Sequence, residues 1–264
     1  MPHQFGRIPP KNAPAMQASA FIRPAEIPTP PKSEDYLDDL NGWKILGNDR
    51  VGDCNAVTWA NMRRLVTAKL AEENYPTQEQ VFQFYKTQNP GFDPNGDPYI
   101  NGPGSNDDQG MEVQTGLEYL HKVGGPDGVK ALAFARVDTT NTQLVDAAIA
   151  IFGGLWLGVM VLDKNEAEFG EGKPWTNAHG GKIVGGHAIL AGGYTPEVKF
   201  ITWGKETEFT FSFWNGEAQG HQLVEEAWVV VWPEHLGSES FMAGVDINEL
   251  KASYEALTGR PLTL

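Results

Sequence analysis

Cysteine is almost absent from this chain, because Cys54 is the only one among its 264 residues. A single thiol excludes an internal disulfide framework. No group of cysteine and histidine residues in the sequence has the spacing that zinc ligands require. We therefore expect no metal site, and the chemistry considered below needs no cofactor.

Positive charge is also scarce, since 20 Lys and Arg stand against 34 Asp and Glu, for a formal net charge of −14. Phosphate backbones and anionic membranes attract clustered basic residues, so this balance disfavours nucleic acid and membrane surfaces as partners. No apolar run approaches the roughly 20 residues that cross a bilayer, and the N-terminus lacks the apolar core of a secretory signal. The sequence predicts an acidic, soluble protein without membrane insertion.

Proline dominates the start of the chain, where it removes backbone N–H donors and disfavours helix at each preceding residue. We expect residues 1–40 to form a Pro-rich extended arm. Two roles fit this composition about equally: a flexible leader, or a segment that wraps the body or a neighbouring subunit in a homo-oligomer. The prolines concerned are Pro2, Pro9, Pro10, Pro14, Pro24, Pro28, Pro30 and Pro31.

The front half, residues 41–140, is predicted to be mainly helical. A helix that begins at Cys54 has apolar side chains on one face, and Asp53 stands at its N-cap position. The run Thr77-Gln78-Glu79-Gln80 is typical of a capping box at the start of a second helix. A third helix is expected over residues 111–123.

The back half, residues 141–240, is predicted to be mainly antiparallel sheet after one helix at 142–152. Runs of aromatic and β-branched residues predict strands. A capping box at Asp246-Ile247-Asn248-Glu249 indicates a C-terminal helix within residues 241–264. The order of elements predicts an α+β fold in which a helical lobe precedes a sheet lobe. The expected strands cover residues 153–161, 187–194, 198–203, 208–213 and 227–232.

An acidic stretch without Lys or Arg lies between Lys86 and Lys122. Its segment Asp93-Pro94-Asn95-Gly96-Asp97 partly matches a calcium-binding loop. The glycine, however, stands at the fourth position, and the bidentate Glu that closes such a loop is missing. We predict a solvated acidic loop here.

Two residues carry the chemistry that the sequence suggests. Cys54 opens a helix, whose N-terminal N–H groups and dipole favour the thiolate and lower the pKa of a thiol. His187 starts a strand 133 residues later. That separation falls within the roughly 130–150 residues typical between the cysteine and histidine of papain-type enzymes. A lone buried cysteine or histidine is more often structural, but their joint spacing predicts a nucleophile and its base.

This arrangement resembles the papain-like cysteine peptidases over about residues 48–232. The resemblance implies two lobes with substrate in the cleft between them, Cys54 as nucleophile and His187 as base. It also implies that Asn48 helps to bind the oxyanion, because Asn48 stands where the family has a glutamine. The remaining residues that the resemblance places in the substrate cleft are Gly52, Asp53, Gly185, Gly186 and Trp203.

The orienting asparagine of the family lies within Asn-Ser-Trp-Gly, and the matching run here is Ile201-Thr202-Trp203-Gly204. Isoleucine cannot accept a hydrogen bond from the imidazole. The role is therefore left to Thr202, to a backbone carbonyl or to Asn215. This departure puts efficient peptidase activity in question.

The segments Asn-Asp-x-x-Gly-Asp-Cys and Thr-Trp-Gly also resemble uncharacterised papain-like proteins of bacteriophages and prophages. That resemblance implies a phage virion or a bacterial cytoplasm as the setting, with virion neighbours as further contacts for the arm. The first function considered is a cysteine peptidase that hydrolyses a peptide or amide bond. The second is an inactive papain-like binding or virion structural protein, which Ile201 favours. The third is a transglutaminase-like or acyltransferase enzyme, but no Asp follows His187 before Asp246, although Glu197 and Glu206 do.

Overall fold

The computed structural model describes residues 3–11, 13–23, 33–96 and 107–264. Its helices and antiparallel strands confirm the α+β prediction. The α-helices are α1 (Cys54–Leu70), α2 (Gln78–Tyr85), α3 (Val113–Lys122), α4 (Thr142–Phe152), α5 (Asn165–Gly170), α6 (Phe211–Trp214), α7 (Glu239–Gly244) and α8 (Ile247–Thr258). The strands are β1 (Glu34–Asp35), β2 (Ala133–Val137), β3 (Leu155–Leu162), β4 (Ile183–Tyr194), β5 (Val198–Thr202), β6 (Lys205–Glu208), β7 (Glu217–Ala218), β8 (His221–Gln222) and β9 (Val224–Val231). Two 3₁₀ turns, η1 (Ala18–Ala20) and η2 (Pro233–Gly237), complete the elements.

One antiparallel sheet organises the molecule, in the order β2-β9-β3-β4-β5-β6, with β1 also paired to β4. The central strand β3 is buried along its whole length, which explains why its sequence is apolar without alternation. Trp156 of β3 lies opposite Trp228 of β9, and Val159 lies opposite His187 of β4. The sheet therefore brings β9 and β4 to the two sides of the same strand.

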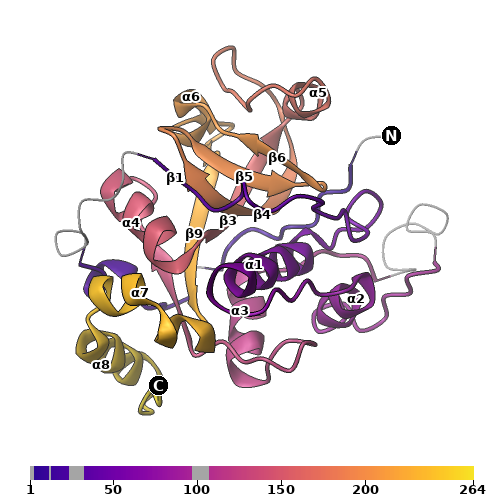
Figure 1. Ribbon diagram of the computed structural model, residues 1–264. Helices are drawn as coiled ribbons and strands as arrows, with labels where there is room; N and C mark the ends of the chain where they lie inside the picture. The colour runs from indigo at the N-terminus through magenta and orange to yellow at the C-terminus, as the bar shows by residue number, and fades with distance from the viewer. Residues whose placement is uncertain (1–2, 12, 24–32, 97–106) are drawn as a thin grey trace.

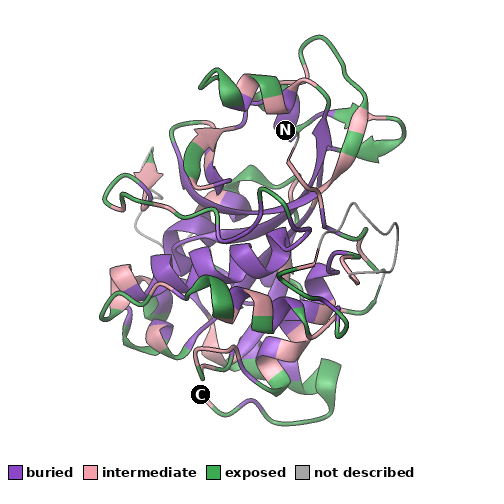
Figure 2. Cartoon of the chain, turned by 90° about the vertical axis from the view of Figure 1, so that its right-hand side faces the viewer, coloured by how far each residue is buried: buried purple, intermediate pink, exposed green. Residues whose placement is uncertain are grey.

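Helices cover both faces of this sheet (Figure 1). On one face, Trp156 and Leu190 share a hydrophobic core with residues of α1, α2 and α3. On the other face, Leu157 and Ile189 share a core with residues of α4, α7 and α8. Figure 2 shows this buried interior as a continuous band between exposed loops. Because side chains alternate along a strand, the adjacent residues Trp156 and Leu157 of β3 enter different cores, as do Ile189 and Leu190 of β4.

The expected helix boundaries hold where capping residues were visible in the sequence. Thr77 forms the predicted capping box with Gln80 at the start of α2. Asp246 accepts hydrogen bonds from the backbone N–H groups of Asn248 and Glu249 at the start of α8. Asp53 stands at the N-cap of α1, as predicted, although its side chain makes no capping bond among the described residues.

The strand expected at 208–213 was also wrong. Strand β6 ends at Glu208, and Phe211–Trp214 form the short helix α6. The Thr210 side chain accepts a hydrogen bond from the Phe213 N–H and so caps this helix. Its aromatic residues lie in a helical turn, with the Phe213 ring stacked on that of Phe209 at a centroid distance of 4.8 Å. Further elements were not predicted from the sequence, namely β1, β2, β7, β8, α5 and α7.

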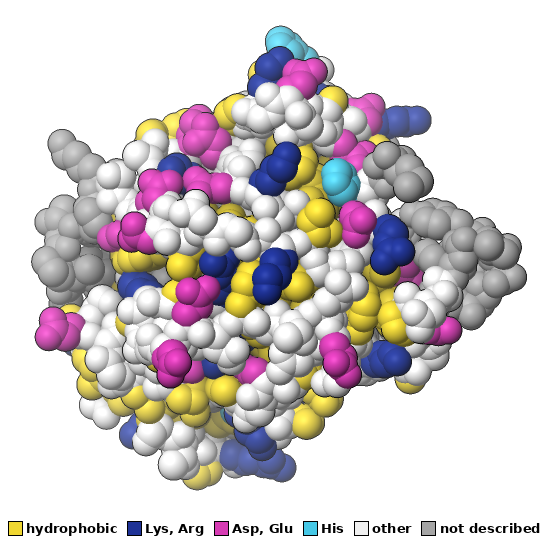
Figure 3. Space-filling view, turned by 45° about the vertical axis from the view of Figure 1, so that its right-hand side comes forward, with side chains coloured by type: hydrophobic (Ala, Val, Ile, Leu, Met, Phe, Trp, Pro, Cys, Tyr) yellow, Lys and Arg dark blue, Asp and Glu magenta, His cyan; other side chains and the backbone are white. Residues whose placement is uncertain are grey.

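The described parts of the first 40 residues lie against the body. Isolated bridges join Arg7 to Met111 and Gln17 to Arg136. A third bridge joins Ile22 to Val245. In the acidic stretch, Asp97 lies outside the described residues, and Asp93 is exposed. No helix among the described residues is long and apolar enough to cross a membrane. Figure 3 shows basic and acidic side chains intermingled on one face of the molecule.

Candidate active site

Cys54 is the first residue of α1 and is 1% exposed. Its sulfur accepts a hydrogen bond from the Ala188 N–H at 3.4 Å, so the N-terminus of α1 lies directly against β4. A second hydrogen bond joins α1 to the neighbouring strand β3, since the Trp156 indole N–H donates to Asn55 at 2.8 Å. The fold thus brings the thiol beside the residue that follows His187.

His187 lies on β4, also 1% exposed, and its Nε2 is 2.7 Å from the Thr202 hydroxyl. Sheet register explains why Thr202 makes this contact. Ile201 pairs with Leu190, and both belong to the core beneath α1. Thr202, one residue later, faces the opposite side, which is the side of His187. Among the described residues, the imidazole Nδ1 has no hydrogen-bond partner.

Trp203 follows Thr202 in a two-residue hairpin between β5 and β6. Both hairpin residues have positive φ, 44° at Trp203 and 76° at Gly204, as a type I′ turn requires. This conformation is strained for a tryptophan, and such strain tends to occur at functional sites. The Trp203 ring stacks on His187 with centroids 4.9 Å apart and on His3 with centroids 4.0 Å apart.

The other predicted site residues lie around the start of α1. Asn48 is 2% exposed, and its side-chain amide donates to the Val51 carbonyl at 3.2 Å. Burial raises the pKa of Asp53 well above its usual range, with the nearby charge of Asp108 adding to the rise. Asp108 also accepts a hydrogen bond from the Gly52 N–H at 3.0 Å. Asn215 is exposed, and its amide donates to the Phe211 carbonyl at 3.2 Å.

The N-terminal segment, residues 3–8, covers this site. The Arg7 N–H donates to the Gly186 carbonyl at 3.0 Å, and the Met111 N–H donates to the Gly6 carbonyl at 2.7 Å. Gly6 passes so close to Gly52 that a Cβ on Gly6 would lie 1.8 Å from the Gly52 carbonyl oxygen. Phe5 packs over Gly185, where a Cβ would lie 2.6 Å from the Phe5 side chain. The predicted cleft residues Gly52, Gly185 and Gly186 therefore lie next to this segment, as does Trp203.

Burial beneath the N-terminal segment sets the protonation of the pair. It raises the pKa of the Cys54 thiol to about 11, although backbone hydrogen bonds from Ala188 and Gly6 oppose the rise. It lowers the pKa of His187 to about 3, with His3 and Arg7 adding to the fall. The expectation of a lowered thiol pKa was wrong for this covered state, because loss of water outweighs the helix terminus. Both groups are neutral here near pH 7.

Three contributors to this site were not predicted from the sequence: Gly6, Arg7 and Glu226. The Arg7 guanidinium is completely buried and forms ion pairs with Glu226, at 2.8 Å, and with Glu225. The sequence did offer one indication that Arg7 pairs with an acid, because Arg7 is a cation in the Pro-rich arm of an acidic chain. Nothing in the sequence indicated which acid would face it.

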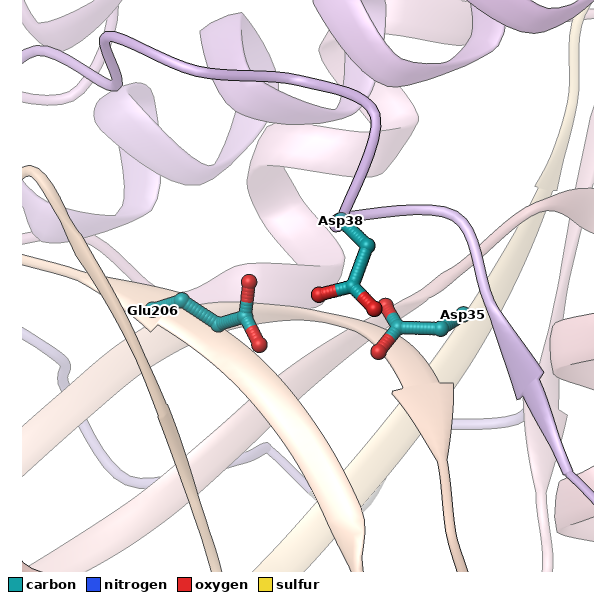
Figure 4. Close-up of side chains that lie close together, drawn as sticks. All are labelled: Asp35, Asp38 and Glu206. Carbon is teal, nitrogen blue, oxygen red and sulfur yellow. The ribbon is translucent and has the colours of Figure 1, made fainter.

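A separate group of carboxylates, Asp35, Asp38 and Glu206, converges at the sheet edge (Figure 4). The Lys199 ammonium lies among them, paired with Asp35, 3.4 Å from Glu206 and 3.7 Å from Asp38. Lys199 supplies the positive charge that these acids need. The group is accounted for as an ion-pair network, and we assign no metal to it.

Comparison with solved structures supports a fold assignment. Xylellain, a cysteine protease from Xylella fastidiosa, superposes with a TM-score of 0.62 over 86% of this chain and 95% of that chain, at 16% identity. The chain has the papain-like fold. A procathepsin B from Trypanosoma congolense gives a papain-like match with a TM-score of 0.53 at 8% identity, covering 86% of each chain. The Carica candamarcensis protease CMS1MS2, in complex with E-64, gives 0.50 at 14% identity over 76% of this chain and 98% of that one.

At these identities the likeness concerns the papain-like fold alone. No family model and no curated protein matches the sequence. In this papain-like chain the helix that begins at Cys54 and the strand that carries His187 meet, as the resemblance implied, while the catalytic roles of these residues stay a prediction.

Proposed function

We propose that this papain-like protein is a cysteine peptidase that the N-terminal segment holds in a covered, latent state. The observation that carries the proposal is the arrangement around His187. Its Nε2 is hydrogen-bonded to Thr202 at 2.7 Å, its Nδ1 has no partner in the part of the chain that the structure describes, and the N–H of the next residue, Ala188, donates to the Cys54 sulfur. An imidazole oriented by a third group and left with one free nitrogen fits a general base.

The reaction would begin when the N-terminal segment leaves and water reaches the pair. In the tautomer with its proton on Nε2, His187 donates to Thr202 and accepts the Cys54 proton at Nδ1. The thiolate then attacks the carbonyl carbon of a peptide bond. The developing oxyanion would be stabilised by the Cys54 N–H and the Asn48 amide, once that amide leaves the Val51 carbonyl.

Collapse of the tetrahedral intermediate breaks the C–N bond. The protonated His187 gives its proton to the leaving amine, and the acyl group stays on the Cys54 sulfur. Water, deprotonated by His187, attacks this thioester and releases the acid, which returns both residues to their starting state. No other group needs to supply electrons or protons.

A second candidate, an inactive papain-like binding or structural protein, is favoured by the same covered state, since both side chains are 1% exposed. A transglutaminase-like enzyme gains no support, because the described contact of His187 Nε2 is to a hydroxyl rather than a carboxylate. A phage or prophage origin and a virion or bacterial cytoplasmic location stay predictions.

The direct test is hydrolysis of a mixture of internally quenched peptides by the full chain. We expect Gly6→Ala, which cannot keep the N-terminal segment seated, to cleave peptides faster than the unmodified chain. Gly6→Ala combined with Cys54→Ala should be inactive. Absence of cleavage by Gly6→Ala, with a correctly folded protein and an accessible Cys54, would favour the inactive alternative.

A further inference from the structure

The Arg7 side chain enters a pocket that the body of the protein builds. The guanidinium is 0% exposed, and its Nη1 donates to Glu226 at 2.8 Å while its Nη2 contacts Glu225. Glu226 is also 0% exposed in its side chain. A buried guanidinium is stable only when carboxylates pair with it in good geometry. The pocket meets that requirement with two acids from consecutive residues of β9.

The carboxylates are held by the body rather than by the N-terminal segment. The Trp228 indole N–H donates to Glu226 at 2.8 Å, and His221 contacts Glu225 at 2.9 Å. Burial raises the pKa of Glu226, and the Arg7 charge opposes that rise. The site is thus prepared for a cation and is poorly satisfied without one.

Gly158 provides the room for the arginine. It pairs with Glu226 of β9 and with Ala188 of β4, on either side of β3. A Cβ at Gly158 would lie 2.6 Å from the Glu226 Cγ and 2.9 Å from the Arg7 Cδ. Any larger residue would therefore close the pocket to a long basic side chain.

The pocket is next to the proposed catalytic pair, because Arg7 occupies the pocket and the preceding residue, Gly6, contacts Cys54. The Arg7 N–H donates to the carbonyl of Gly186, which precedes His187. The Gly6 backbone, in turn, contacts the Cys54 sulfur. A peptide that replaces the segment in this cleft would pass the same two acids.

We propose that Glu226, with Glu225 beside it, forms a specificity pocket that selects an arginine side chain in the peptide bound across Cys54. The inference rests on the proposed function for its catalytic meaning, but the binding pocket can be tested alone. Arginine is preferred to lysine, because its planar guanidinium engages two carboxylates at once. In the covered state, Arg7 occupies this pocket and so helps to hold the N-terminal segment in place.

Binding tests the pocket directly, with the full chain carrying Arg7→Ala so that the pocket is vacated. The probe is a fluorescein-labelled peptide, His-Gln-Phe-Gly-Arg-Ile, and its analogue with uncharged citrulline for arginine. Fluorescence polarisation gives each dissociation constant, and mass spectrometry checks that the peptide stays intact. We expect the arginine peptide to bind at least about tenfold more tightly than the citrulline peptide.

Adding Glu226→Gln to Arg7→Ala should remove that preference, and adding Glu225→Gln should reduce it. Glu217→Gln, an exposed acid on β7, is the matched control and should leave the preference unchanged. Circular dichroism confirms that each variant is folded. Equal affinity for the two peptides, an unchanged preference in the Glu226→Gln variant, or no peptide binding would each overturn the proposal.

The two proposals fail in different ways. If the arginine preference is present but no variant hydrolyses a peptide, the pocket stands as a binding site and the peptidase proposal falls. If peptides are hydrolysed at equal rates with arginine or citrulline, the peptidase stands and the pocket proposal falls.

Discussion

His187 Nε2 lies 2.7 Å from the Thr202 hydroxyl, so a threonine occupies the contact that the papain-like resemblance would assign to an asparagine. The imidazole is further fixed by the Trp203 ring, stacked with centroids 4.9 Å apart. Loss of asparagine at Ile201 therefore does not leave His187 without an orienting partner. Whether this arrangement supports catalysis is open to several direct tests.

We expect the hydrogen bond between Thr202 and His187 to be needed for full peptidase activity. Thr202→Val keeps the shape of the side chain but removes the hydrogen bond, which should leave the His187 ring free to adopt unproductive orientations. In the Gly6→Ala background we expect peptide hydrolysis to fall about 10- to 100-fold. Thr202→Asn should retain more activity than Thr202→Val. Thr207→Val on β6 is the control, and an equal loss there would show that the effect is structural.

We expect a substitution at Gly6 to displace the N-terminal segment, residues 3–8, from the site. A methyl group on Gly6 would lie 1.8 Å from the Gly52 carbonyl oxygen, a separation that the two backbones must relieve by moving apart. We expect Gly6→Ala to increase hydrogen exchange at residues 3–8 and to speed alkylation of Cys54. Gly237→Ala, where a Cβ meets no atom of the described residues within 4 Å, should change neither. Unchanged exchange in Gly6→Ala would show that the segment tolerates the methyl group.

We expect removal of the Arg63 side chain, on α1, to lower the stability of the fold strongly. Its side chain is 1% exposed and pairs with Asp127 at 2.7 Å and with Glu234 at 2.7 Å. Arg63→Ala would leave buried carboxylates uncompensated and should lower the free energy of unfolding by about 3–5 kcal/mol. Lys122→Ala, which breaks an exposed pair with Glu118, should cost less than about 1 kcal/mol. Urea unfolding measures both, and similar losses would contradict this ranking.

We expect the protonation of His235 to make the free energy of unfolding depend on pH. Its Nδ1 accepts the Trp232 N–H at 2.9 Å, and its Nε2 lies 3.0 Å from the Phe152 carbonyl oxygen, so the ring is neutral. Burial lowers the pKa of His235 from 6.5 to about 4. The unfolded chain therefore takes up a proton first as the pH falls. Stability should be complete above about pH 6.5 and decline toward pH 4, by up to about 3 kcal/mol from this residue.

Two histidine variants test whether His235 causes this pH dependence. His187, whose pKa is lowered to about 3, acts in the same direction, so His235→Gln should reduce the pH dependence without abolishing it. His179→Gln, at an exposed position, should leave the profile unchanged. An identical slope of unfolding free energy against pH in His235→Gln and the unmodified chain would rule out His235 as the cause.

Sequence reasoning succeeded where the determinants are local. The capping residue Thr77 and the helix from Cys54 to Leu70 were predicted closely, because their signals lie within a few residues of the element. The strand predicted at 208–213 failed because aromatic content is shared by strands and buried helical turns. Thr210, the residue that caps α6, carried the only local indication of a helix.

The site could be predicted only in part, because much of it depends on register and on distant contacts. Thr202 and Ile201 are neighbours in sequence, and only the pairing of β5 with β4 decides which one faces His187. The approach of Gly6 to Gly52, and of Arg7 to Glu226, joins segments with no shared pattern. The raised pKa of the Cys54 thiol follows from that covering and could not be foreseen from the helix terminus alone.

The most direct measurement is the rate of Cys54 alkylation by iodoacetamide as a function of pH, in Gly6→Ala with and without His187→Ala. Our account predicts rapid alkylation of Gly6→Ala well below pH 7, because an uncovered imidazole stabilises the thiolate, and slow alkylation of the unmodified chain. The His187→Ala variant should react only as the pH approaches the free-thiol pKa of about 8.5. The same free-thiol profile in all three proteins would contradict a Cys54–His187 catalytic pair.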